Sequence, residues 1–387
     1  MAHTDTTDLA DFRRTRAHLE ALLGTPAHKT EALYLLWEVC QACGDPESAL
    51  RYLDEAIRRN PVHSRLRTGD TVDRTILAIA RAGDFQANLP VNFLFDQKTA
   101  LHTLWLPDPG DSPACLELEL PDALPDFDCI FITIAQDSRH VAALELADRL
   151  AEQLQKPIIN RGAKISRLSR DGAARLLSEV SDAVVPRQCL RDKTELLTAP
   201  KWETSIVRPI SSHAGHGLAR IDTQPELAQY LLRACSSDAF YVAPFIDFRS
   251  LDGHYRKYRI VFIEGVPYPV HLAIHDDWKV WYYNSRMDRD AWKRAEEERF
   301  LADLPGAMGE PATQALSAIG QALDLDYVGL DCSVLADGRL LVFEIETGMI
   351  VHDKDSAPEL AYKKQYMRNI FAALEHMIDT RIGSVRA

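Results

Sequence analysis

The chain has 387 residues, of which 46% are hydrophobic and 26% are charged, as expected of a globular protein with two or three domains. Its formal net charge of −13 argues against a protein that follows nucleic-acid phosphates or binds an anionic membrane surface. No apolar run is long enough to span a membrane, the N-terminus lacks the basic and apolar regions of a signal peptide, and the seven cysteines are scattered. We therefore expect a cytoplasmic protein with reduced thiols.

The first part of the chain is predicted to be helical. Residues 31–43 carry apolar side chains at helical spacing, and Pro46 opens a second amphipathic helix that ends at Asn60. This hairpin resembles the second half of a tetratricopeptide repeat, and a weaker echo of it is predicted over residues 76–82. We expect a tetratricopeptide-like helical module over residues 1–88 that caps the fold or docks a partner protein.

The pattern changes to that of an α/β domain after residue 90. Residues 91–95 and 101–106 are predicted strands, and the apolar run 129–134 is typical of a strand that is buried on both faces. A helix over 138–154 and a strand over 157–160 complete a βαβ unit. These elements predict a small α/β domain over residues 89–165, after which a helix over 171–180 follows.

A glycine-rich loop follows the predicted strand 205–209, which carries Arg208 near its end. Glycines let backbone N–H groups approach phosphates closely, and a flanking cation neutralises their charge. Three further elements are predicted: a strand over 240–246, a hairpin over 257–267 and an aromatic-rich strand over 278–284. The glycine loop alone is weak evidence for a phosphate-binding site. Its position in the chain, before the later elements, makes that evidence more specific.

The segment 330–346 predicts a β-hairpin that turns at residues 336–338. Glu344 and Glu346 are alternate residues of the second strand and point to the same face, which Asp331 on the partner strand can join. Three clustered carboxylates repel one another unless cations lie between them, and such oxygen ligands suit Mg²⁺ shared with substrate phosphates. An exposed acidic hairpin without a ligand is the alternative.

This succession of elements resembles the ATP-grasp superfamily, specifically the carboxylate–amine ligases related to glutathione synthetase and D-alanine ligase. The likeness covers about residues 90–350 and leaves the helical N-terminus outside. It implies an α+β fold in which the small α/β domain precedes a two-lobed ATP-grasp domain over 166–387. The lid lobe would span about 185–247 and the metal-binding lobe about 248–387, with ATP between their antiparallel sheets.

Carried onto this sequence, the resemblance implies three groups of site residues. The Mg²⁺ ligands would be Asp331, Glu344 and Glu346. Arg208 would contact phosphates, Arg259 would face the acyl phosphate, and Asn284 would line the acceptor side. The phosphate lid and the hinge for adenine and ribose would comprise Ser211, Ser212, His213, Gly215, His216, Gly217, Ala243, Phe245, Ile246 and Asp247.

Several positions depart from the family pattern. Glu346 stands where Asn is usual, and Ala243 stands where Glu is usual. Gly172 occupies the place of a phosphate-binding lysine, so Arg167 or Arg170 would have to supply that charge.

Two site residues also have other interpretations. His213 and His216 form an HxxH pair, but no third zinc ligand has a suitable spacing. Arg259 is also suited to pair with Glu264 across the predicted hairpin.

The predicted activity is that of an ATP-dependent ligase with ATP and Mg²⁺ as cofactors. It would join a carboxylate to an amine through an acyl phosphate and release ADP and phosphate. Its substrates would be small molecules or peptides, and a homo-oligomer is compatible with this prediction. The alternatives are a phosphotransferase on the same fold and a nucleotide-sensing scaffold whose helical module docks a partner protein.

Overall fold

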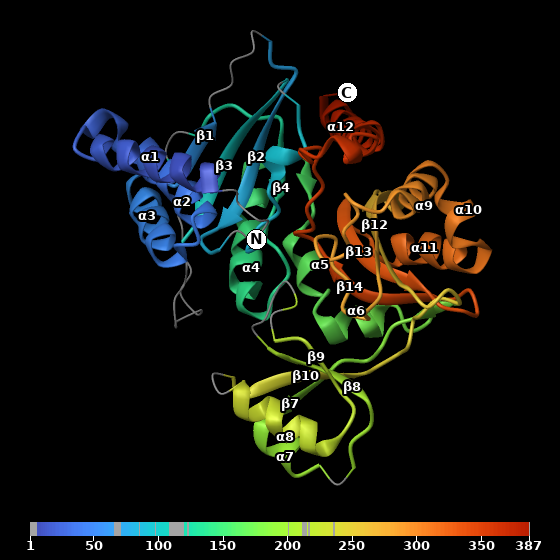
Figure 1. The fold of residues 1–387 in the computed structure, drawn as a ribbon. Coiled ribbons are helices and arrows are strands. Elements are labelled where there is room, and N and C mark those ends of the chain that lie inside the picture. The colour runs from blue at the N-terminus through green and yellow to red at the C-terminus, as the bar shows by residue number, and fades with distance from the viewer. Residues whose placement is uncertain are drawn as a thin grey trace.

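The computed structural model describes residues 6–65, 71–84, 86–96, 98–107, 120–121, 124–199, 201–210, 215, 217–234 and 237–386. Within these residues, three β-sheets and the helices around them form an α+β fold (Figure 1). This agrees with the predicted fold class. None of the helices in the described part of the chain combines the length and the apolarity that crossing a membrane requires.

The N-terminal helices are α1 (Thr6–Leu22), α2 (Lys29–Ala42) and α3 (Pro46–Arg59). Helix α3 begins after Asp45, whose carboxylate accepts a hydrogen bond from the Ser48 N–H at 3.1 Å, as an N-cap does. The predicted helical hairpin is therefore confirmed, whereas its assignment to the tetratricopeptide repeats stays a prediction.

The first sheet has the order β1-β3-β2-β4-β5. Its strands are β1 (Val62–Arg65), β2 (Arg74–Arg81), β3 (Thr99–Leu106), β4 (Cys129–Ile132) and β5 (Ile158–Ile159). Neighbouring strands run parallel, except that β1 is antiparallel to β3. The 3₁₀ turn Ser138–His140 and helix α4 (Val141–Leu154) connect β4 to β5, so the predicted βαβ unit is confirmed.

Two predictions in this region are wrong. Residues 76–82 were expected to be helical, but most of them belong to β2, because an unbroken apolar run suits a central strand that is buried on both faces. The predicted end of the helical module at residue 88 therefore falls after two strands of the sheet. The strand expected over 91–95 is a 3₁₀ turn (Val91–Phe93), in which Val91 and Leu94 point inward at helical spacing.

The second sheet forms a small lobe that lies apart from the other two, at the bottom of Figure 1. Its order is β7-β10-β8-β9, and its neighbouring strands are antiparallel. The elements are β7 (Cys189–Asp192), α7 (Lys193–Leu197), β8 (Ser205–Pro209), β9 (Ala219–Ile221), α8 (Gln224–Arg233) and β10 (Ala239–Pro244). Buried side chains of Leu196, Val207 and Phe240 give this lobe a core of its own.

The third sheet has the order β12-β11-β13-β14-β6. Its strands are β6 (Ala183–Val184), β11 (Tyr255–Ile263), β12 (Val266–His275), β13 (Tyr327–Val334) and β14 (Leu340–Glu346). Both predicted hairpins are confirmed. Residues 278–284 form turns after β12 and not the expected strand, because the side chain of Asn284 bonds to the backbone of Lys279 and Trp281 and closes a loop.

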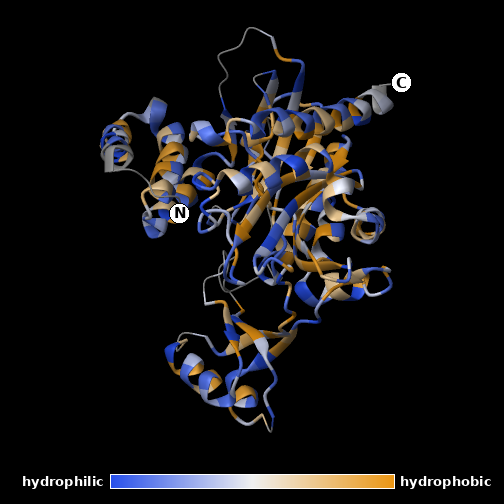
Figure 2. Cartoon of the chain, turned by 45° about the vertical axis from the view of Figure 1, so that its right-hand side comes forward, coloured by the Kyte–Doolittle hydropathy of each residue, from blue (hydrophilic) through white to orange (hydrophobic). Residues whose placement is uncertain are grey.

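Helices link and cover the two large sheets, which share one continuous apolar core. The helices are α5 (Gly162–Ser166), α6 (Arg170–Leu176), α9 (Ala291–Ala302), α10 (Leu304–Met308), α11 (Glu310–Leu323) and α12 (Lys363–Arg386). Figure 2 shows the hydrophobic residues concentrated along the strands of these sheets and on the helix faces that pack against them. Arg74 of β2 binds Asp379 of α12 at 2.7 Å, and this ion pair ties the last helix to the first sheet.

Asn160 joins the first sheet to the third. Its side chain is buried, donates to the Tyr327 carbonyl at 2.7 Å and accepts from the Tyr327 N–H at 2.9 Å. Asn160→Ala removes both hydrogen bonds and leaves two buried backbone groups without partners, so we expect the free energy of unfolding to fall by about 2–4 kcal/mol. Chemical denaturation measures this change. Gln155→Ala, at an exposed residue that also has a positive φ, should change stability by less than about 0.5 kcal/mol; equal effects would contradict this role of Asn160.

Candidate functional site

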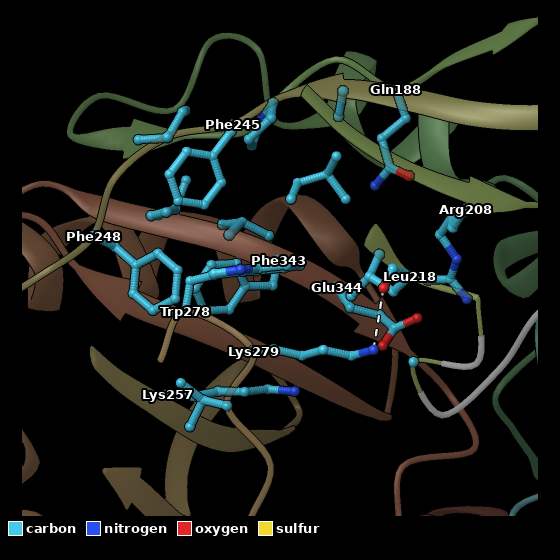
Figure 3. Close-up of a pocket in the computed structure, with 18 of the residues that line it drawn as sticks. Gln188, Arg208, Leu218, Phe245, Phe248, Lys257, Trp278, Lys279, Phe343 and Glu344 are labelled. Atoms are coloured by element: carbon cyan, nitrogen blue, oxygen red, sulfur yellow. Dashed lines mark hydrogen bonds between the residues drawn. The ribbon is translucent and has the colours of Figure 1, made fainter. Parts of the chain in front are cut away.

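A cavity of about 200 Å³ lies between the small lobe and the third sheet. Strands β8 and β10 form one side, and β11, β14 and the loop 278–281 form the other. Figure 3 shows two different halves: Phe245, Phe248, Trp278 and Phe343 gather on one side, while charged side chains point into the other. The cavity therefore suits a ligand with a flat apolar part and a strongly charged part.

A β-bulge sets which side chains of β14 face this cavity. Asp331 pairs with Glu344 and Cys332 pairs with Val342, so Phe343 is the extra residue of the bulge. Strict alternation would put Phe343 and Glu344 on opposite faces, but the bulge allows both to line the cavity. The apolar wall and the acidic group consequently come from one short strand.

Asp331 binds Lys257, which lines the cavity, and is itself almost completely buried, at 1% exposure. Lys257 Nζ lies 2.6 Å from one of its oxygens, and Arg259 donates to both oxygens at 2.8 and 3.0 Å. Burial alone would raise the pKa of Asp331, but the charges of Arg259 and Lys257 outweigh it and hold the pKa well below its usual range. Asp331 is therefore an ionised carboxylate between two cations, and the structure pairs Arg259 with it rather than with Glu264.

Glu344 lies beside two arginines at the charged end of the cavity. Arg170 donates to Glu344 Oε1 at 2.9 Å. Burial would raise the pKa of Glu344, but the charges of Arg170 and Arg208 outweigh it and lower the pKa. Burial and the charge of Arg170 lower the pKa of Arg208 to about 10. An additional anion in the cavity would oppose that shift, because it would stabilise the protonated form of Arg208.

The glycine loop reaches the cavity through Gly215. This residue has φ +70°, and a Cβ atom there would lie 2.5 Å from the Trp281 ring. Gly215 therefore packs closely against the opposite wall, from which Lys279 Nζ donates to the Leu218 carbonyl at 3.1 Å. Four predicted lid residues lie outside the described residues, namely Ser211, Ser212, His213 and His216.

The remaining predicted site residues separate into two groups. Those that line the cavity are Arg208, Gly215, Ala243, Phe245, Ile246 and Glu344. Gly217, Asp247, Arg259, Asn284, Asp331 and Glu346 are not part of its lining. The Glu346 Oε1 atom accepts the Gly348 N–H at 2.8 Å, and Asp247 is exposed and accepts the Arg249 N–H at 3.0 Å. The roles of these residues stay predictions.

Arg167 and Arg170 were the two candidates to replace the positive charge of the lysine expected at Gly172, and the structure distinguishes between them. Arg170 lines the cavity, whereas Arg167 donates to the Leu323 carbonyl at 2.8 Å. A Cβ atom at Gly172 would lie 2.3 Å from the Arg167 carbonyl oxygen. The backbone just before α6 therefore leaves no room for a side chain at Gly172, and of the two arginines Arg170 is the one that lines the cavity.

Lys257 and Lys279 are cavity cations that the sequence reasoning missed. Lys257 alternates with Arg259 along β11, so period-two spacing from a predicted site arginine was an available signal. Lys279 lies in a loop and carries no comparable signal in the sequence.

The charged end of the cavity contains one carboxylate, that of Glu344. Among the described residues, no group of three or more histidine, cysteine, aspartate or glutamate side chains is close enough to hold a metal ion. Mg²⁺, however, is commonly held by one or two carboxylates together with substrate phosphates and water. Glu344 faces the cavity, whereas Lys257 and Arg259 already bond to the oxygens of its register partner Asp331, so Glu344 is the carboxylate that fits Mg²⁺ arriving with a phosphate-bearing ligand.

No family model and no curated protein matches the sequence. The chain is similar to the solved structure of the D-alanine–D-alanine ligase from Coxiella burnetii, with 13% identity, a TM-score of 0.48 and coverage of 82% of this chain and 97% of that one. It is also similar to the VanG D-Ala:D-Ser ligase from Enterococcus faecalis, with 13% identity, a TM-score of 0.45 and coverage of 78% and 99%.

A third similar structure is the RimK domain protein ATP-grasp from Sphaerobacter thermophilus DSM 20745, with 15% identity, a TM-score of 0.43 and coverage of 76% and 99%. At such low similarity, the activity has to be inferred from the site itself.

Proposed function

We propose that the protein is an ATP-dependent carboxylate–amine ligase of the ATP-grasp type. The observation that carries this proposal is the cavity between the small lobe and the third sheet, apolar on one side and lined by four cations and Glu344 on the other. A purine ring with a triphosphate has this combination of a flat apolar part and concentrated negative charge.

The adenine would lie on the apolar side of the cavity, between the walls that contain Ile206, Phe245 and Phe343. Pro244 has no N–H group, and the Phe245 N–H already bonds to the Thr204 carbonyl at 3.1 Å. We therefore expect the base to be held by stacking and by carbonyl acceptors more than by backbone donors of this segment.

The phosphates would lie among Arg170, Arg208, Lys257 and Lys279. These cations come from α6, β8, β11 and the loop after β12, so they surround the charged half from several directions. Glu344 and Glu346 of β14, together with Asp331 of β13, would hold Mg²⁺. The metal would supply charge neutralisation during phosphoryl transfer.

In the proposed reaction, a substrate carboxylate oxygen attacks the γ-phosphorus of ATP, and the bond to the β-phosphate oxygen breaks to give an acyl phosphate and ADP. An amine nitrogen then attacks the acyl carbon, phosphate leaves, and the nitrogen loses a proton. The cavity cations stabilise the developing negative charge. The small lobe, which touches the opposite wall at Gly215, limits the access of water to the acyl phosphate.

Arg208 should control nucleotide affinity in this arrangement. Arg208→Gln removes a charged donor from the phosphate side, so we expect the Kd for ATP to rise about tenfold to a hundredfold by calorimetry. Arg191→Gln changes an exposed arginine of the same sheet and should leave the Kd unchanged. Equal Kd values for both variants would contradict phosphate binding at Arg208.

An assay that measures the release of ADP and of free phosphate, with mass spectrometry of the product, tests the proposed activity directly. The protein is supplied with Mg²⁺ and ATP together with panels of carboxylates and amines, including amino acids and short peptides. We expect phosphate release that requires both substrate classes, together with a product of the mass of their amide. A stable phosphorylated product formed from one substrate alone would instead identify a phosphotransferase.

A further inference from the structure

Four ionisable side chains form a row across the third sheet. His271 of β12 pairs with Arg259 of β11, Arg259 pairs with Asp331 of β13, and Asp331 pairs with Glu344 of β14. Residues that are directly paired in neighbouring antiparallel strands have their side chains on the same face of the sheet. The face that presents Glu344 to the cavity therefore continues through Arg259 to His271.

The row lies at the charged end of the cavity. Strands β11 and β14 run in the same direction, because both are antiparallel to β13. Phe248, in the aromatic wall, precedes β11, whereas Lys257 and then Arg259 follow along that strand. On β14, the wall residue Phe343 likewise precedes Glu344. The terminal phosphate of a nucleotide, which is farthest from the base, would therefore face this row, and so would the group that receives it.

His271 is the member of the row that has no hydrogen-bond partner. Within the described part of the chain, neither ring nitrogen of His271 bonds to another residue. The residue is half-buried, and its nitrogens are not among the unpaired polar atoms that are shielded from solvent. Both nitrogens are therefore open to a ligand that enters along this face of the sheet.

Tyr282 fixes the position of the imidazole. The centroids of the two rings are 4.7 Å apart, and the rings are tilted by 39°. The Tyr282 hydroxyl donates to the buried carboxylate of Glu297 at 3.1 Å, and Glu297 also accepts the Leu272 N–H at 3.1 Å. Leu272 is the neighbour of His271 in β12, so Glu297 ties Tyr282 to the strand that carries the histidine. A base that is held in this way needs little reorganisation before it acts.

The surroundings of His271 keep it unprotonated. Burial, together with the charges of Arg259 and of Lys363 at the start of α12, holds the pKa of His271 well below its usual range. The charge of Asp331 opposes this effect from the far side of β11, and that of Lys257 adds to it. A neutral imidazole has a free lone pair, which a proton acceptor requires.

A second histidine, His352, lies in the segment that follows β14. Its Nδ1 atom accepts the Lys354 N–H at 3.2 Å, and its ring lies 6.5 Å from the ring of Phe93. It does not belong to the row, because β14 ends at Glu346. Of the two histidines, His271 is therefore the one that is placed beside Arg259 with both nitrogens unbonded.

We propose that His271 is the general base of the second half of the ligase reaction, an inference that rests on the proposed function. As the amine nitrogen bonds to the acyl carbon, His271 takes one proton from that nitrogen, and the bond between the carbon and the phosphate oxygen breaks. The imidazolium, which lies beside Arg259 and near Lys363, then gives its proton to the departing phosphate and becomes neutral again. The products are the amide and hydrogen phosphate.

Trapping of the acyl phosphate separates the two half-reactions. The full chain is supplied with Mg²⁺, ATP and a carboxylate that it accepts, and with either the amine substrate or hydroxylamine. Hydroxylamine is unprotonated at neutral pH and reacts with acyl phosphates without a base. Hydroxamate formation therefore measures the acyl phosphate, whereas amide formation measures the complete reaction.

His271→Gln keeps a polar side chain but accepts no proton at neutral pH. We expect the kcat for amide formation to fall by at least about a hundredfold, with hydroxamate formation unchanged. His271→Asn removes the base with a shorter side chain and should show the same difference between the two rates, and chemical denaturation verifies that each variant is folded. His376→Gln, at an exposed histidine of α12, is the matched control and should leave both rates unchanged.

Equal losses of amide and hydroxamate in a folded His271 variant would overturn the proposal, because a base for the amine does not act in the first half-reaction. Unchanged rates would overturn it as well, and so would a selective loss of amide formation in His352→Gln instead. If the unaltered protein forms no hydroxamate from any carboxylate, the ligase itself is contradicted, and the base with it. The failure of the base alone is thus distinguishable from the failure of the proposed function.

Discussion

Replacing Glu344 by glutamine is expected to lower the kcat for ATP turnover by at least about a hundredfold. The neutral amide removes the carboxylate that faces the charged half of the cavity, and it leaves Arg170, which binds Glu344 at 2.9 Å, without its counter-charge. Glutamine has nearly the same shape and keeps an acceptor oxygen for Arg170. We therefore expect the free energy of unfolding to change by less than about 1 kcal/mol. Steady-state kinetics and chemical denaturation measure the two quantities.

Asp337→Asn is the matched control for this change. Asp337 lies in the turn of the same β-hairpin, is exposed, and binds Arg339 at 2.8 Å. The same carboxylate-to-amide substitution there should leave kcat unchanged. If Glu344→Gln turns over ATP at the rate of the unaltered protein, the acidic group does not serve phosphoryl transfer and the proposed role is wrong.

Replacing Asp331 by asparagine is expected to lower the free energy of unfolding by about 3 kcal/mol at neutral pH. The substitution leaves Lys257 and Arg259 close together without the carboxylate that pairs with both. Their side chains are 21% and 24% exposed, so solvent relieves part of the repulsion. For this reason, we expect a value at the lower end of the range for a broken buried pair.

The pH dependence of stability identifies the source of this effect. The pKa of Asp331 is held below its ordinary value of 3.8, so its contribution is complete above about pH 4 and is lost as the pH falls toward the lower folded-state pKa. The unaltered protein should therefore lose more stability below pH 4 than Asp331→Asn does. Asp324→Asn, at an exposed partner of Lys164, should cost less than about 1 kcal/mol; an equal loss for both variants would contradict the account.

The regular elements of the chain could be predicted well where local patterns decide the structure. The two hairpins around Glu264 and residues 336–338, and the βαβ unit around helix α4, follow from alternation, helical spacing and turn residues. Strand β2 was missed because its alanines and its Gly-Asp ending match a helical repeat as well as a strand. Only its position in the middle of a sheet, which depends on β3 and β4, decides between the two.

The candidate site could be predicted in part. Arg208, Glu344 and three hinge residues were expected at a ligand site, and all of them line one cavity. The bulge at Phe343 was not predictable, because it depends on the register between β13 and β14. The pairing of Asp331 with two cations also requires the neighbouring strand β11, whose register with β13 the sequence does not specify.

Photolabelling with an azido-adenine analogue of ATP most directly tests the claim that the cavity is a nucleotide site. The account predicts that the label attaches to peptides from residues 243–248, 278–281 or 341–343, and that ATP prevents the labelling. Labelling that ATP does not prevent, or labelling confined to residues outside these three segments, would contradict it.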